Sequence, residues 1–148
     1  RVKHPGGIDH QPCHLIDIMA TCLDAAGTEY PAQYEGRRPV PAEGISLLPL
    51  AEGRRLPVRP IFAEHEGNRM VRLGRWKLVA SYYNGQRWEL YDIAHDRTEQ
   101  HDLAARHPRR VARMAQLYFR WADANGVLPY PQLMNEYGGQ KMKIYNER

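Results

Sequence analysis

Two segments of the chain repeat apolar residues at helical spacing. Residues 14–26 place apolar side chains three or four positions apart, and Gly27 follows where helices commonly end. A second helix is predicted to open at Pro108 and to end at Gly126. We expect its apolar stripe to pack on a sheet, since a sheet buries one face against helices. The stripe consists of Val111, Met114, Ala115, Tyr118, Trp121 and Ala122.

Short runs between these helices have the β-branched and aromatic content of strands. They cover residues 61–63, 70–73, 76–80 and 88–91. Turn signals separate them, at Gly67-Asn68, Gly74-Arg75 and the hairpin dipeptide Asn84-Gly85. Runs this close together predict an antiparallel meander. Two of them carry Trp76 and Trp88, for which anchoring of the sheet is favoured over stacking on a sugar.

In the rest of the chain, proline and glycine residues disfavour regular secondary structure. Residues 7–13 look extended, and residues 28–45 hold too many breakers for regular structure. Ser46 is predicted to cap one short helical turn that ends at Gly53. From Tyr130 onward no periodicity remains, and an extended arm is expected.

Composition narrows the class of protein. The chain has 148 residues, 43% of them hydrophobic and 26% charged, which is ordinary for a globular domain. Its formal charge of +4 is a mild bias toward anionic ligands. No basic run interleaved with aromatics occurs, so no nucleic-acid partner is expected. No apolar stretch of about 18 residues occurs either, so no membrane span is expected.

The two cysteines do not indicate a disulfide framework or a metal site. Cys13 and Cys22 lie nine residues apart, which is not a metal-ligand spacing. We expect both to be buried thiols.

The stretch Glu64-His65-Glu66-Gly67-Asn68-Arg69 carries the candidate chemistry. Its nearest motif is the zinc-binding H-E-x-x-H, but Arg69 occupies the place of the second histidine and Gly67 disfavours the required helix. His65 is instead expected at a strand end, where a side chain can be aimed at a neighbouring site. The alternative is structural, with Asn68 making the turn and Arg69 paired to a flanking glutamate. Asp17 and Asp92 are expected to be caps or turn formers.

Three longer stretches resemble the sulfatase family, the arylsulfatase-like branch of the alkaline phosphatase superfamily. In chain order they are HLIDIMATCLDAAG, RPIFAEHEGNRMVRLGRWKLV and WELYDIAHDRTEQHDLA, followed by a helix ending in WADANGVLP. The resemblance implies an α/β protein and the C-terminal part of that fold. Residues 1–56 would finish the large α/β catalytic domain with a strand, a helix and a proline-rich loop. Residues 57–129 would form a four-stranded antiparallel sheet packed on a long C-terminal helix, and residues 130–148 an extended tail.

The resemblance also implies a sulfuric ester hydrolase acting on aryl or carbohydrate sulfates. Sulfatases use a formylglycine, made from cysteine or serine in a C-x-P-x-R motif, and Ca²⁺. Neither cysteine starts that motif, and Pro57-Val58-Arg59 lacks a Cys or Ser two residues earlier. The nucleophile and the Ca²⁺ ligands are therefore expected upstream, in a missing N-terminal catalytic portion.

Three expectations about function follow from this resemblance. The chain alone should be inactive and contain no catalytic or metal-binding residue. His65 and Asn68 are the substrate-binding residues that it implies, at the rim of the pocket. Two alternatives remain open: a phosphonate or phosphodiester hydrolase of the same superfamily, and a stand-alone module that binds anionic glycans.

Overall fold

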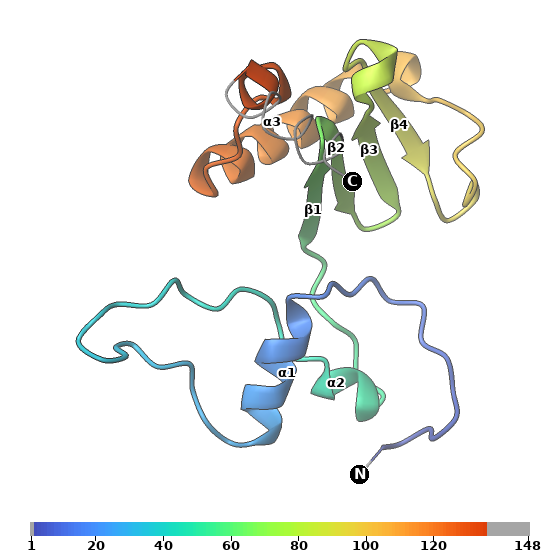
Figure 1. The fold of residues 1–148 in the computed structure, drawn as a ribbon. Helices are drawn as coiled ribbons and strands as arrows, with labels where there is room; N and C mark the ends of the chain where they lie inside the picture. Colours follow the sequence, from blue (N-terminus) through green and yellow to red (C-terminus); the bar gives the residue numbers. More distant parts are fainter. Residues whose placement is uncertain (1, 136–148) are drawn as a thin grey trace, which may run out of the picture. The chain divides into compact units, whose positions relative to one another are not determined.

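The computed structural model describes residues 2–135, and the chain divides into two compact units (Figure 1). The first unit ends at Val58 and the second begins at Arg59, two residues beyond the expected boundary. Among the described residues, no helix is both long enough and apolar enough to cross a bilayer.

The first unit is organised around α1 (Asp17–Ala25). Asp17 is completely buried, and its carboxylate accepts the backbone N–H of His14 at 2.7 Å and of Ile45 at 3.0 Å. This side chain therefore joins the start of the helix to the end of the proline-rich loop. Gly27 follows the helix with a φ of 62°, as expected of a helix terminator. Asp17 is thus structural as a turn former rather than as a helix cap, because α1 has no side-chain capping hydrogen bond.

The apolar side chains of α1, and that of Leu15 just before it, are not buried within this unit. Leu15, Ile18 and Met19 are 77%, 54% and 53% exposed. Cys13 and Cys22 are exposed free thiols, so the expectation that they are buried is wrong. The reason is that the described part of the first unit has no buried hydrophobic residue: Asp17 is its one buried side chain.

No strand forms in residues 2–58, where the resemblance implied one before the helix. Residues 7–10 and 12–14 are irregular, because a strand requires a hydrogen-bonded neighbour and these residues have no strand beside them. The proline-rich loop contains an isolated bridge between Tyr34 and Arg37. It leads to α2 (Leu48–Ala51), where the Ser46 hydroxyl accepts the N–H of Leu48 at 3.2 Å and Gly53 has a φ of 70°, as predicted.

The second unit is the predicted antiparallel meander. Its strands pair in chain order as one four-stranded sheet. They are β1 (Pro60–His65), β2 (Asn68–Leu73), β3 (Trp76–Ala80) and β4 (Trp88–Asp92). The central row of the register is Phe62, Val71, Leu78 and Leu90. The last three of these are completely buried, so this row is the apolar centre of one sheet face.

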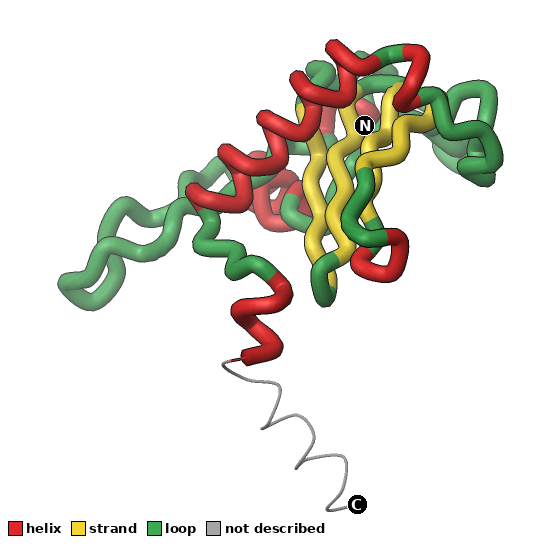
Figure 2. The backbone as a smooth tube through the Cα atoms, turned by 90° about the horizontal axis from the view of Figure 1, so that it is seen from above, coloured by secondary structure: helices red, strands yellow, loops and turns green. Residues whose placement is uncertain are grey.

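The long helix α3 (Pro108–Ala124) covers this face of the sheet, as Figure 2 shows. It buries Met114, Ala115, Tyr118 and Ala122, four members of the predicted stripe. The other two, Val111 and Trp121, pack at the margin of the same core. Trp76 and Trp88 also pack against this core, which confirms their role as anchors. At typical values, burying each large apolar side chain contributes about 1.5–3 kcal/mol.

The expected tail begins in helical backbone. Residues 130–135 are helical, in place of the extended backbone expected there. Residues 136–148, the remainder of that tail, lie outside the described residues.

Candidate functional site

The candidate residues lie at the end of the sheet that carries the β1–β2 turn. His65 is the last residue of β1 and Asn68 is the first of β2, and the two are directly paired in the register. The connection between β3 and β4, which holds the short 3₁₀ helix η1 (Tyr82–Asn84), reaches the same end (Figure 2). Two connections far apart in sequence thus meet beside His65.

The turn itself consists of Glu66 and Gly67, which differs from the predicted Gly67-Asn68 turn. Both residues have left-handed backbone, with φ of 51° and 82°. Two consecutive positive φ values match the right-handed twist of the strands that the turn joins. Gly67 also donates its N–H to Glu64 Oε1 at 2.8 Å. A Cβ at Gly67 would lie 2.9 Å from Tyr130, so the glycine is required by both its φ and the close packing of that ring.

His65 projects into solvent from this turn. Its side chain is 82% exposed, and Nδ1 is 4.0 Å from a carboxylate oxygen of Glu66. The surrounding residues form strand ends and a turn rather than the helix that H-E-x-x-H requires. The imidazole is therefore accessible to a ligand. That it binds substrate stays a prediction.

Asn68 uses its side-chain amide within the protein. Nδ2 donates to the backbone carbonyl of His65 at 3.0 Å, and Oδ1 accepts the N–H of Tyr82 at 3.1 Å. This one side chain thus connects the β1–β2 turn to η1. Direct substrate binding by Asn68 likewise stays a prediction, but its amide geometry is that of a tie between two connections.

Arg69, which follows Asn68 in β2, does not pair with a flanking glutamate as the structural alternative expected. Its guanidinium donates to the carbonyl of Gln86 at 3.1 Å and lies 4.7 Å from the centre of the Trp88 ring. Arg69 is therefore directed at the β3–β4 connection, and not at the flanking glutamates. Such a cation over an aromatic face adds roughly 0.5–2 kcal/mol.

The β3–β4 connection contains the predicted turn dipeptide Asn84-Gly85. It occupies residues 81–87, between the ends of the two strands. Ser81 caps η1 by accepting the N–H of Tyr83 at 3.2 Å. Gly85 and Gln86 then return the chain with φ of 73° and 61°. The connection fills the seven residues that the predicted strand runs 76–80 and 88–91 left between them, and Ser81 caps a helical turn within it.

Three tyrosines that the sequence did not single out gather at this site. The Tyr82 ring is 4.6 Å from that of Tyr130 and 5.8 Å from that of Tyr83, with edge-on geometry in both pairs. In the sequence, the pair of tyrosines directly before Asn84-Gly85 was the one feature that could have indicated an aromatic cluster. Only the fold brings Tyr130 to it.

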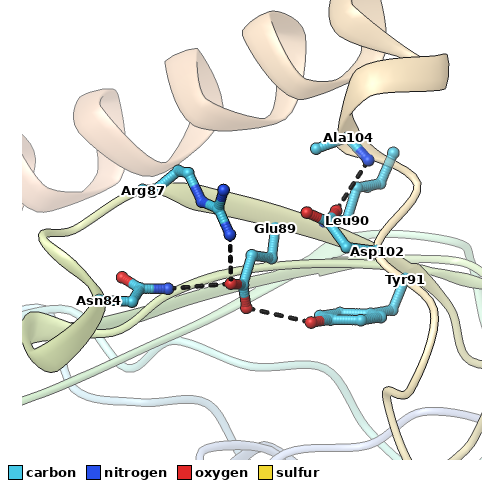
Figure 3. A network of polar contacts seen from close by, with 7 residues as sticks. All are labelled: Asn84, Arg87, Glu89, Leu90, Tyr91, Asp102 and Ala104. Atoms are coloured by element: carbon cyan, nitrogen blue, oxygen red, sulfur yellow. Dashed lines mark hydrogen bonds and ion pairs between the residues drawn. The ribbon is translucent and has the colours of Figure 1, made fainter.

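A carboxylate holds the other end of this connection in place (Figure 3). Glu89 accepts from Asn84 Nδ2 at 3.1 Å, Arg87 Nη2 at 3.3 Å and the Tyr91 hydroxyl at 3.0 Å. Burial and the acceptor Glu89 raise the pKa of Tyr91 to about 12, so its hydroxyl stays protonated and donates. The hydrogen bonds of Glu89 thus have a structural role, which is to hold the β3–β4 connection against β4.

The remaining acidic candidate is also structural, as predicted. Asp92 binds Arg75 and the Nδ1 of His95, and accepts the N–H of Ala94 at 3.4 Å. Partial burial opposes ionisation of Asp92, but the hydrogen bonds from His95 and Arg75 outweigh it and lower its pKa. Across residues 2–135, no three His, Cys, Asp or Glu side chains are grouped so as to hold a metal ion.

Similarity to known proteins agrees with the resemblance read from the sequence. The chain is 27% identical over 123 residues to an uncharacterized sulfatase of Schizosaccharomyces pombe. That match covers 79% of this chain and 22% of the yeast protein. No protein-family profile matches the chain.

Solved structures with the same fold include sulfatases. A 2-O GAG sulfatase is 28% identical with a TM-score of 0.51, and covers 75% of this chain with 25% of its own. A candidate sulfatase from Bacteroides thetaiotaomicron is likewise 28% identical with a TM-score of 0.51. A protein solved with D-glucosamine-2-N,6-O-disulfate shares the fold at 22% identity and a TM-score of 0.55.

The chain is therefore a homologue of sulfatases in both sequence and structure. It spans between a fifth and a quarter of the length of these relatives, 22% of the yeast protein and 25% of the 2-O GAG sulfatase. Its α/β content, its four-stranded antiparallel sheet and its long helix are consistent with a C-terminal part of such a protein.

Proposed function

We propose that this chain is the C-terminal portion of a sulfuric ester hydrolase that cleaves aryl or carbohydrate sulfates. The supporting observation is the joint match of sequence and fold to sulfatases, at 27% identity over 79% of the chain and at 28% identity with a TM-score of 0.51. A fold alone does not define an activity. Here the sequence identity to sulfatases supports the proposal in addition to the shared fold.

In this proposal the reacting groups lie in an upstream catalytic portion. That portion would supply the formylglycine nucleophile and the Ca²⁺ ligands. The described residues of this chain do not suit Ca²⁺, which prefers six to eight oxygen ligands. The carboxylate of Asp17 accepts backbone N–H groups, and that of Asp92 binds Arg75 and His95.

The contribution of this chain is a rigid support for groups at the edge of the substrate pocket. In the proposal, His65 donates a hydrogen bond to an oxygen of the sulfate ester or of the organic leaving group. The exposure of its ring and its place beside a tight turn support this role, because the paired strand end fixes the backbone from which the imidazole projects.

His65→Ala in the complete protein tests this assignment. We expect a lower kcat/KM on sulfate esters with an unchanged Tm. His101→Ala is a matched control, since His101 is 81% exposed and lies outside the candidate site. Equal activity of the two variants would remove His65 from the site.

The class of enzyme is tested by the coding sequence upstream of Arg1. We expect an in-frame C-x-P-x-R or S-x-P-x-R motif, whose first residue mass spectrometry should find converted to formylglycine in the purified complete protein. An upstream portion with an unmodified nucleophile of another type would favour the phosphonate or phosphodiester hydrolase. A reading frame without any catalytic portion would favour the glycan-binding module.

A further inference from the structure

Tyr83 is presented to solvent in a way that packing does not explain. Its relative exposure is 91%, the highest of any large hydrophobic residue in the described part of the chain. Its neighbour Tyr82 is 41% exposed and holds it edge-on. A tyrosine ring offers a broad apolar face with few rotatable bonds, so it binds ligands at a low entropic cost.

The loop that carries Tyr83 is held rigidly. The N–H groups of residues 82, 83 and 86 are bound by Asn68 Oδ1 at 3.1 Å, Ser81 Oγ at 3.2 Å and the Ser81 carbonyl at 2.9 Å. Arg69 holds the carbonyl of Gln86 from the neighbouring strand. These bonds fix the backbone beneath the exposed ring, which is the preorganisation that a binding surface needs.

Backbone strain is concentrated at the same end of the sheet. Among the described residues, four other than glycine have positive φ, and two of them are Glu66 (51°) and Gln86 (61°). Each lies in one of the two connections that Asn68 joins. Left-handed backbone costs such residues about 1–2 kcal/mol, and strain of this kind gathers at functional sites.

Donors for an anionic ligand lie at the same end of the sheet as Tyr83. The side chain of His65 is 82% exposed, and that of Arg87, in the same loop as Tyr83, is 73% exposed. The neighbouring acids are Glu66, 50% exposed, and Glu89, which is 23% exposed and occupied by Arg87, Asn84 and Tyr91. The surface therefore combines an apolar ring with accessible cationic and hydrogen-bonding groups.

We propose that Tyr83 is a specificity-determining residue that stacks on a sugar ring of a sulfated carbohydrate, and that Asn68 positions it. The C–H face of a pyranose is apolar and packs against an aromatic ring, while His65 and Arg87 meet its hydroxyl and sulfate groups. The sugar ring that Tyr83 contacts would be a part of the substrate that does not react. The inference rests on the proposed sulfatase function, and selects carbohydrate sulfates over aryl sulfates.

Two kinds of substrate test this on the complete protein. One is a panel of carrageenan, heparan sulfate and chondroitin sulfate oligosaccharides, and the other is 4-nitrophenyl sulfate, which offers no sugar ring. Stacking worth about 0.5–1.5 kcal/mol corresponds to a rise in KM of roughly 2- to 13-fold in Tyr83→Ala on the oligosaccharide that the wild type cleaves best. We expect no change on 4-nitrophenyl sulfate, and wild-type behaviour in Tyr83→Trp.

Tyr34→Ala is the matched control, because Tyr34 is 65% exposed in the first unit and far along the chain. An equal effect of Tyr83→Ala on both substrates, or none on the oligosaccharide, would overturn the inference. So would a wild-type protein that prefers 4-nitrophenyl sulfate to every oligosaccharide.

Equilibrium binding of the same oligosaccharides separates this inference from the proposed function. If the complete protein hydrolyses no sulfate ester, the proposed function fails. The inference then survives only if an oligosaccharide binds the wild type and binds Tyr83→Ala more weakly. Absence of binding would overturn both.

Discussion

Asn68 shows how a single side chain can connect two separate loops at one end of a sheet. Its two amide atoms bind the carbonyl of His65 and the N–H of Tyr82. Each such hydrogen bond contributes about 0.5–1.5 kcal/mol. The sequence identified Asn68 as a candidate but placed it in the turn. The tie to Tyr82 spans fourteen residues and depends on the sheet register, which no local pattern encodes.

Replacing Asn68 with alanine should therefore loosen the loop of residues 81–87. We expect faster hydrogen exchange at the amides of Tyr82 and Tyr83, measured by mass spectrometry or NMR. Asn125→Ala is the control, since Asn125 also donates to a backbone carbonyl, that of Trp121, at 2.8 Å. Unchanged exchange in Asn68→Ala would show that the amide does not hold the loop.

The lowered pKa of Asp92 gives the second prediction at this scale. Because the folded pKa lies below its ordinary value of 3.8, ionised Asp92 stabilises the fold above that pH. This stability is lost as the pH falls through the folded pKa. Asp92→Asn should thus be less stable than the wild type at pH 7, and the difference should shrink as the pH falls below 3.8.

Acid and urea titrations followed by tryptophan fluorescence can measure this. All three tryptophans, Trp76, Trp88 and Trp121, lie in the second unit and report on its unfolding. Asp123→Asn on the exposed surface of α3 is the control. A difference between Asp92→Asn and wild type that stays constant down to pH 2 would rule out the ionised network as its source.

At the scale of elements, the hairpin β1–β2 depends on one glycine for two separate reasons. Gly67 and Gly85 both have left-handed φ, of 82° and 73°. A Cβ at Gly67 would meet Tyr130 at 2.9 Å, whereas a Cβ at Gly85 would meet nothing within 4 Å. Comparison of the two therefore separates strain from packing.

We expect Gly85→Ala to lower the free energy of unfolding by about 1–2 kcal/mol, from the left-handed backbone alone. Gly67→Ala should cost about 1 kcal/mol more, because Tyr130 must move as well. Urea unfolding of both variants provides the numbers. Equal losses would mean that the Tyr130 contact contributes nothing to the turn.

The elements also show which features a sequence can predict. The strands were predictable from short β-branched and aromatic runs between turn signals, and α3 from apolar residues three to four positions apart. The tyrosine cluster was not, since Tyr82 and Tyr130 are brought together only by the fold. The burial of Cys13 and Cys22 was mispredicted for a similar reason: periodicity marks an apolar helix face, but not whether the chain contains the surface that covers it.

At the scale of the whole molecule, the two units differ in what stabilises them. Every buried hydrophobic residue described belongs to the second unit, from Ile61 to Ala122. In the first unit, Ile18 and Met19 of α1 and Leu15 just before it are exposed. In the proposed complete protein, the upstream portion would cover this face.

Hydrogen exchange on the 148-residue chain and on the complete protein tests this. We expect the amides of β2, β3 and α3 to be protected in both proteins, and those of α1 to be protected only in the complete one. Strong protection of α1 in the 148-residue chain would instead indicate that this chain is a self-sufficient module.

The most direct test of the sulfatase assignment is the release of inorganic sulfate, measured by ion chromatography. The complete protein should release sulfate from sulfate esters, and should do so faster than it cleaves phosphodiesters or phosphonates. Release should stop when the upstream Cys or Ser of the expected motif is replaced by alanine, and residues 1–148 alone should release none. Sulfate release by residues 1–148 alone, or cleavage of phosphodiesters without any release of sulfate by the complete protein, would contradict the assignment.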